Sequence, residues 1–166
     1  MITNYSYLLP DKKTKVIFSK NVLEHMFSFV QDKYHLSEAG GQLFSRNPDD
    51  ANIIIDEITG PYLSDKRSRY NWIPDVTKMS SDREQLFDKG SYIIGLWHTH
   101  QELTPHPSQK DKVTCEKHLQ LLDSVYRGFL LITMGNGSPN PVLSIEYLER
   151  KDYKLRPSAI IANKLL

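Results

Sequence analysis

The chain has 166 residues, a length typical of one domain with a sizeable core. Its 21 Lys and Arg against 20 Asp and Glu give a formal net charge of +1, which does not favour nucleic acid or an anionic membrane as the main partner. Its single cysteine, Cys115, excludes an internal disulfide and favours a reducing compartment. The sequence has no convincing signal peptide and no apolar stretch near the roughly twenty residues that a membrane-spanning helix needs, so we expect a cytoplasmic protein.

Helices and strands alternate in the first half of the chain. Apolar residues at helical spacing predict a helix that is capped by Ser19 and continues to Val30. Residues 38–44 and 52–58 read as strands, and residues 82–89 read as a short helix.

The second half continues the alternation. Its predicted elements are a buried strand at 91–97, a helix at 108–122 and strands at 129–133 and 142–147, the last two joined by a turn at 135–139. The interleaving predicts an α/β or α+β fold, a single domain with a mixed sheet flanked by helices. We assign the domain to residues 1–150 and expect residues 151–166 to form a loosely attached C-terminal tail.

Chemically reactive side chains are concentrated between residues 98 and 111. His98 and His100 end the strand at 91–97 and, being two residues apart, project from the same face. Ser108 and Asp111 open the next helix, where a three-residue step also places both side chains on one face. Two imidazoles, a carboxylate and a hydroxyl are the set that a hydrolytic zinc centre uses when it keeps one coordination position open for water.

This pattern resembles the JAMM metallopeptidase family, in which a glutamate is followed by His-[Ser/Thr]-His, seven residues, Ser, two residues and Asp. In the prokaryotic branch the glutamate precedes a Gly-Gly-x-Leu strand, and Glu38 matches it. The resemblance implies that His98, His100 and Asp111 bind one zinc ion per chain, that Glu38 is the general base, and that Ser108 helps to hold the tetrahedral oxyanion.

Some positions depart from the pattern or compete with it. Gln101 stands where many members of the family have proline, and Ser45 where many have glycine; neither is a ligand. Other carboxylates are candidate bases, namely Asp56, Glu57 and Glu102. We prefer Glu38 on the family match and place Glu57 second.

Three further residues have ordinary structural interpretations. Cys115, three residues before His118, suggests a thiol nucleophile, but a mid-helix cysteine is far more often inert packing. His106 either supports the metal ligands or contacts the substrate, or, more commonly for a loop histidine, is solvated. Trp97 alternates away from His98 and is expected in the core.

The segment 60–72 interleaves cations with aromatic residues. Together with the histidine motif it is similar to the small JAMM proteins of bacterial integrative elements, which include the deconjugating peptidase of CBASS antiphage operons. That resemblance implies a protein substrate, a cyclic-nucleotide synthase conjugated through its carboxyl terminus, whose terminal amide bond is cleaved. In this interpretation Arg67 and Arg69 pair with the tail and Trp72 covers its apolar part; an ordinary surface loop is equally compatible with the sequence.

Three other functions stay open. A JAMM protein can instead process a ubiquitin-like sulfur-carrier protein, it can be a non-catalytic scaffold of the same fold, or it can associate with DNA. The intact ligand set with Glu38 argues against a scaffold, and the near-neutral charge argues against DNA. The oligomeric state, the modifier and the cleavage preference are not determined by the sequence.

Overall fold

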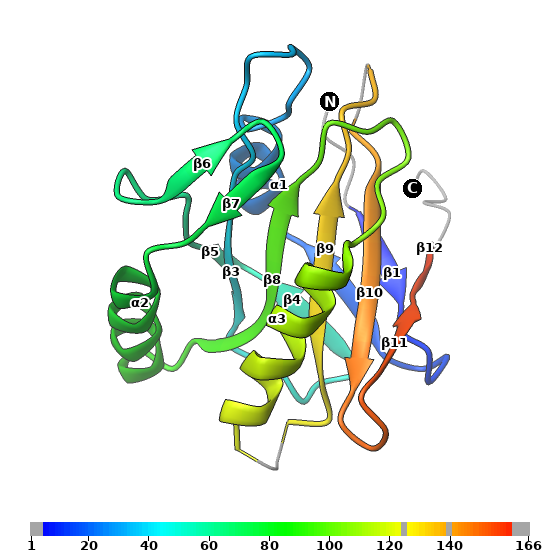
Figure 1. Ribbon diagram of the computed structural model, residues 1–166. Helices are drawn as coiled ribbons and strands as arrows, with labels where there is room; N and C mark the ends of the chain where they lie inside the picture. Colours follow the sequence, from blue (N-terminus) through cyan, green and yellow to red (C-terminus); the bar gives the residue numbers. More distant parts are fainter. Residues whose placement is uncertain (1–4, 124–125, 139–140, 161–166) are drawn as a thin grey trace.

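The computed structural model describes residues 5–123, 126–138 and 141–160 (Figure 1). The helices are α1 (Lys20–Phe27), α2 (Val76–Asp88) and α3 (Gln109–Leu121). The strands are β1 (Ser6–Leu8), β2 (Lys15–Phe18), β3 (Gly40–Ser45), β4 (Asn52–Ile55), β5 (Glu57–Ile58), β6 (Lys66–Ser68), β7 (Asn71–Ile73), β8 (Tyr92–Thr99), β9 (Gly128–Met134), β10 (Leu143–Glu149), β11 (Lys154–Pro157) and β12 (Ala159–Ile160).

A six-stranded mixed sheet in the order β11-β10-β9-β8-β3-β5 forms the centre of the molecule. Strands β8 and β9 run parallel and the other neighbours run antiparallel. Every residue of β9 is buried, and so is almost all of β8, because both faces of these strands are covered. Strands buried on both faces read as continuous apolar runs, as these two do. The expected mixed α/β architecture is therefore confirmed.

The two faces of this sheet pack against different layers. Helix α1 and the second sheet (β12-β1-β2-β4) enclose one apolar cluster, which includes Trp97. Helices α2 and α3 lie over the opposite face (Figure 1), where Met79, Leu96 and Cys115 belong to a second cluster. Since successive residues of a strand alternate between faces, His98 points to the side of α3. The strand thus ends with its histidine facing the start of that helix.

Several predicted boundaries need correction. The strand expected at 52–58 is two strands in different sheets: β4 runs parallel to β2, and β5 pairs with β3. The helix expected at 82–89 begins earlier, at Val76, because the carboxylate of Asp75 accepts hydrogen bonds from the backbone N–H groups of Thr77 and Lys78. Hydrophobic periodicity did not reveal that cap.

The first helix is shorter than expected. Helix α1 ends at Phe27 and not at Val30, with Ser28 as its C-cap. Ser19 is the N-cap residue, as predicted, but its hydroxyl donates to Asn21 Oδ1 at 2.7 Å and caps no backbone N–H.

The described residues beyond 150 join both sheets. Strand β11 pairs with β10, and β12 pairs with β1, so the loose attachment expected there is not seen over residues 154–160. The boundary at residue 150 stays a prediction. Of the predicted turn at 135–139, Pro139 lies outside the described residues. Within the described parts of the chain, no helix is both long and apolar enough to cross a bilayer.

Candidate metal centre

The end of β8 is fixed by hydrogen bonds to its neighbours. Thr99 N–H donates to Ala39 O at 2.9 Å, and Ala39 N–H donates back to Thr99 Oγ1 at 3.0 Å. The same hydroxyl donates to Oε1 of Gln31, a fully buried side chain. Beyond the strand, His100 N–H donates to Met134 O at 2.8 Å. The threonine of the motif thus anchors the strand from one face, and the two histidines project from the other.

His98, His100 and Asp111 converge on one point. His98 Nε2 lies 3.1 Å from His100 Nε2 and 3.2 Å from Asp111 Oδ2, and His100 Nε2 lies 3.6 Å from Asp111 Oδ2. A tetrahedral zinc ion with bonds of about 2.0–2.1 Å needs ligand atoms about 3.3 Å apart. The three observed separations match that requirement, so this donor set fits a tetrahedral cation with a fourth position left over.

The third donor is held by the start of α3. Ser108 is the N-cap, and Asp111 Oδ2 accepts from both Ser108 N–H (2.7 Å) and Ser108 Oγ–H (2.6 Å). Asp111 N–H donates back to Ser108 Oγ at 3.2 Å, which completes a capping box. The Ser-x-x-Asp spacing therefore both starts the helix and orients the Asp111 carboxylate.

Glu38 lies at the same site, two residues before the neighbouring strand β3. Gly40 pairs with His98 in the antiparallel register of β3 and β8, and continuing that register two residues places Glu38 opposite His100. Glu38 lines a hollow of about 250 Å³ together with His98, His100, Ser108 and Asp111. The structure thus brings together all five residues that the sequence assigns to the site. Glu38 joins the other four although it precedes His98 by 60 residues.

The charges in this hollow are strongly coupled. Burial raises the pKa of Glu38 to about 7, with His100 opposing the shift and Asp111 adding to it. Burial alone would raise the pKa of Asp111, but hydrogen bonds from His100 and His98 lower it well below its usual range. Burial lowers the pKa of His100, yet the hydrogen bond to Asp111 and the surrounding carboxylates raise it overall. Two imidazoles facing a carboxylate that stays ionised are suited to a cation.

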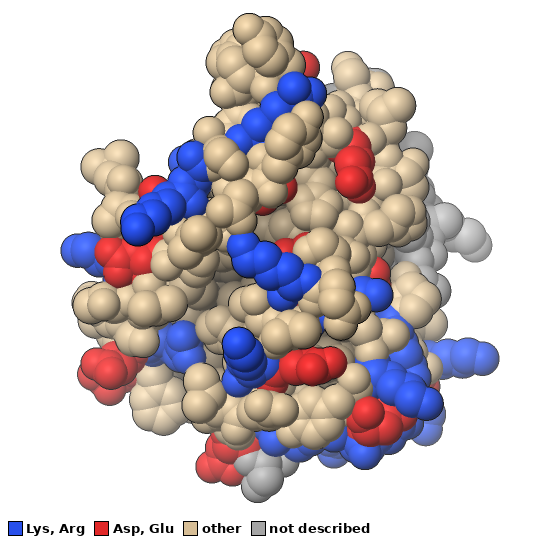
Figure 2. All heavy atoms as spheres, viewed as in Figure 1, with Lys and Arg blue, Asp and Glu red and all other residues tan. Residues whose placement is uncertain are grey.

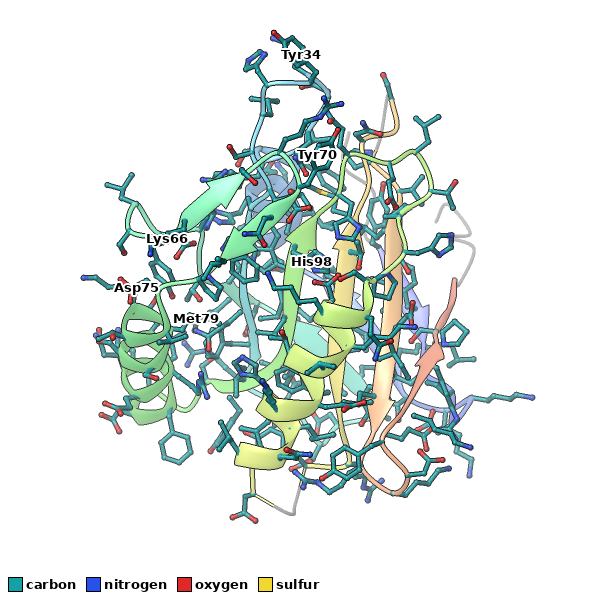
Figure 3. The ribbon with its side chains drawn as sticks, in the orientation of Figure 1. Tyr34, Lys66, Tyr70, Asp75, Met79 and His98 are labelled. Atoms are coloured by element: carbon teal, nitrogen blue, oxygen red, sulfur yellow. The ribbon has the colours of Figure 1, made fainter. Side chains whose placement is uncertain are left out.

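A hairpin formed by β6 and β7 lies over the site. In Figure 3, His98 lies near the end of β8, with Tyr70 above it at the turn of the hairpin. The ring of Trp72 occupies the space over Gly40, where a Cβ atom would come within 2.6 Å of it. Asn71 Oδ1 accepts a hydrogen bond of 2.6 Å from Lys110 Nζ of α3. The hairpin therefore contacts both the β3 side and the α3 side of the site.

A second hollow opens beside the first. It is lined mainly by apolar side chains and shares Trp72, His98, Lys110 and Asp111 with the hollow that contains Glu38. Figure 2 shows acidic atoms recessed in the middle of this face, between projecting basic side chains. The candidate metal centre is thus open to solvent on one side and borders an apolar pocket on another.

The arginines of the hairpin are already engaged within the chain. Arg67 donates to the carbonyl oxygens of Glu38 and Ser37, and Arg69 donates to the side chain of Gln101. The expectation that both guanidinium groups are available to pair with a substrate tail is revised by these contacts.

The thiol alternative has no structural support. Cys115 is fully buried in the apolar cluster under α3, and burial raises the pKa of its thiol far above the usual range. His118 stacks on Phe129, and burial together with Arg83 lowers its pKa to about 4. Trp97 is buried in the core, as expected.

The competing carboxylates separate by position. Glu57 forms an ion pair of 2.7 Å with Arg46 and is paired with Phe44, four residues along β3 from Gly40, which is about 13 Å at the usual strand rise. Asp56 lies beside the same arginine. Glu102 does line the hollow, with Oε2 3.8 Å from His100 Nδ1. It also accepts a hydrogen bond from the backbone of His106, whose side chain is exposed.

Sequence reasoning missed two contributors. Lys110 lines both hollows. Its position in the sequence between Ser108 and Asp111 could have indicated that it lies at the site. The buried hydrogen bond between Gln31 and Thr99 could not be predicted from any local sequence pattern, because 68 positions separate the two residues.

Residues 20–146 match the family model described as prokaryotic homologs of the JAB domain. This fold and this donor set define a prokaryotic domain of the JAB/JAMM class, and the chain belongs to that family. The resemblance drawn from the sequence motifs is thereby confirmed.

Two bacterial relatives share much of the chain. A protein of Pseudomonas aeruginosa named "CD-NTase/cGAS isopeptidase" is 32% identical over 110 residues, which are 64% of this chain and 69% of the relative. A protein of Escherichia coli with the same name is 28% identical over 111 residues, 65% of this chain and 70% of the relative.

Solved structures share the fold. The solution structure of protein DSY2949 from Desulfitobacterium hafniense superposes with a TM-score of 0.62 and 18% identity, covering 90% of this chain and 93% of that one. The solution structure of a Salinibacter ruber protein has a TM-score of 0.52 and 14% identity, covering 89% and 91%. At these identities the likeness concerns the fold.

Proposed function

We propose that the protein is a zinc-dependent isopeptidase that hydrolyses the amide bond at the carboxyl terminus of a conjugated protein. The observation that carries the proposal is the arrangement of three ligand atoms at 3.1–3.6 Å with a half-buried glutamate in the same hollow. His98, His100 and Asp111 would hold the ion. Such an ion, when bound, supplies Lewis acidity that lowers the pKa of water to about 7 and polarises a carbonyl.

The remaining chemistry falls to side chains of the chain. Burial raises the pKa of Glu38 to about 7 in the metal-free chain. A cation bound beside it would favour its ionised form, which would accept a proton from the attacking water. It would return that proton to the departing amine as the C–N bond breaks, and an amine leaves poorly without one. Ser108, whose hydroxyl donates to Asp111 Oδ2 in this structure, would turn that hydrogen to the developing oxyanion; one such donor is typically worth about 10²-fold or more in rate.

The substrate class is proposed from the relatives and from the shape of the site. Both relatives carry the name "CD-NTase/cGAS isopeptidase", and we infer a cyclic-nucleotide synthase tail as the substrate here, in antiphage defence in the cytoplasm. The apolar pocket beside His98 suits a side chain of that tail. Strand β7 pairs with β6 on one side, and extended peptides are often held by strand addition at such an edge.

The test uses purified full-length protein loaded with zinc and two fusions to one reporter, one ending in a cyclic-nucleotide synthase tail and one in a ubiquitin-like sulfur carrier. We expect cleavage after the synthase tail, loss of activity with a chelator and recovery with zinc. Glu38→Gln should retain zinc while activity falls by ~10²-fold or more. Glu57→Gln is the matched control, since that carboxylate pairs with Arg46 away from the hollow, and it should be as active as wild type.

The other outcomes point elsewhere. Preferential cleavage of the sulfur-carrier fusion would assign the protein to a biosynthetic pathway. Absence of both zinc binding and cleavage would favour the scaffold function, and loss of zinc from Glu38→Gln would show that Glu38 is a ligand.

A further inference from the structure

Both backbone polar groups of Glu38 are bound by the β6–β7 hairpin. The N–H of Glu38 donates to Ser68 O at 2.8 Å. Its carbonyl oxygen accepts from Arg67 Nε at 2.5 Å, and Arg67 Nη2 also reaches Ser37 O at 3.4 Å. The guanidinium therefore spans two consecutive carbonyl groups at the residue that we assign as base.

Glu38 needs this support because the sheet does not provide it. The ladder between β3 and β8 starts at Gly40 and His98, and the last hydrogen bonds beyond it join Ala39 to Thr99. Glu38 is one residue further out, beyond the strand itself. Without the hairpin its peptide groups would have no partner in the sheet.

Arg67 is suited to the task by its chemistry and surroundings. Its planar guanidinium can donate in two directions from a fixed geometry, and a hydrogen bond from an ionised donor is about twice as strong as a neutral one. The group lies 5.9 Å from the centre of the Phe29 ring, a cation–π distance that holds it against the core. Arg67 is thus restrained on both sides.

We propose that Arg67 is a positioning residue that fixes the backbone of Glu38 and so keeps its carboxylate at the metal centre. The inference rests on the proposed role of Glu38 as base. A displacement of about 1 Å at a catalytic group can cost about 10²-fold in rate. Arg67 therefore acts on turnover through Glu38 and does not bind the substrate tail.

The kinetic test compares zinc-loaded Arg67→Ala, Arg67→Lys and Lys66→Ala on the cleaved fusion. We expect Arg67→Ala to lower kcat by at least ~10-fold with KM within about twofold of wild type and zinc content unchanged. Arg67→Lys should recover part of kcat, because an ammonium group donates to one of the two carbonyl groups. Lys66→Ala removes a positive charge from the same strand and should match wild type. A raised KM with unchanged kcat would overturn the proposal and assign Arg67 to substrate binding.

A second measurement does not depend on the reaction. In metal-free protein, NMR hydrogen exchange of the Glu38 amide should be at least ~10-fold faster in Arg67→Ala than in wild type or Lys66→Ala, because local opening becomes easier. Equal exchange rates would overturn the positioning role. If the wild-type enzyme cleaves neither fusion, the proposed function fails, and the exchange rates alone decide the inference about Arg67.

Discussion

The carboxylate of Asp111 and the hydroxyl of Ser108 hold each other across the first turn of α3. Asp111 Oδ2 accepts from the backbone N–H and the hydroxyl of Ser108 at 2.7 and 2.6 Å, and Ser108 Oγ accepts from Asp111 N–H at 3.2 Å. The same Oδ2 faces both histidine Nε2 atoms. Helix initiation and the proposed metal ligand are therefore one structural unit.

Ser108→Ala should weaken both functions of this unit. Loss of the cap should lower the free energy of unfolding of metal-free protein by about 1 kcal/mol, and loss of the hydrogen bond to Asp111 should weaken zinc binding by ~10–100-fold. Thermal unfolding and competitive zinc titration measure the two effects. Ser108→Thr keeps the hydroxyl and serves as the control. Unchanged zinc affinity in Ser108→Ala would show that Asp111 is oriented without its cap.

Asp111→Ala should remove most of the metal. The wild-type chain should carry close to one zinc ion per molecule after gentle purification, since its three donors leave a single open position, and elemental analysis checks this. Glu116→Ala, which removes a carboxylate from the same helix, should keep its zinc. Full zinc occupancy in Asp111→Ala would contradict the proposed ligand set.

Glu38 should make the stability of metal-free protein depend on pH. Because burial raises its folded pKa from 4.5 to about 7, ionisation is easier in the unfolded chain, and the wild-type protein loses stability as pH rises from about 4.5 to 7. Glu38→Gln does not ionise, so it should become more stable relative to wild type over that window and keep its advantage above it. Chemical denaturation at several pH values measures the difference. A constant difference from pH 4 to 8 would contradict the raised pKa.

Cys115 should matter for packing only. Cys115→Ser places a hydroxyl among apolar side chains and should cost about 1–3 kcal/mol of stability, while kcat of the folded enzyme stays at the wild-type value. Cys115→Ala leaves no polar group to bury and is the control for that cost. A large loss of kcat in both variants, at temperatures where both are folded, would revive the thiol alternative.

Prediction from sequence succeeded where the determining contacts are local. His98 and His100 share a face because a strand alternates, and Ser108 and Asp111 share one because a helix turns every 3.6 residues. The strand at 52–58 shows the limit: its apolar run ends at Ile55, before Asp56 and Glu57, but this local pattern does not say that the chain there passes from one sheet to the other. Strand pairing is decided by partners distant in the chain, and no local pattern encodes it.

The sequence by itself determined the donor types, their spacing along β8 and α3, and the mixed α/β class, since side-chain chemistry and backbone periodicity are local properties. Glu38 came from a family match, and only the pairing of β3 with β8 places it opposite His100. The tertiary structure alone decided that Arg67 binds the backbone of Glu38 and that the hairpin spans the site. The first contact joins residues that are 29 positions apart, and the contact of the hairpin with α3 joins residues that are 39 positions apart. Such contacts form because only the whole folded chain buries its apolar side chains and pairs its polar groups.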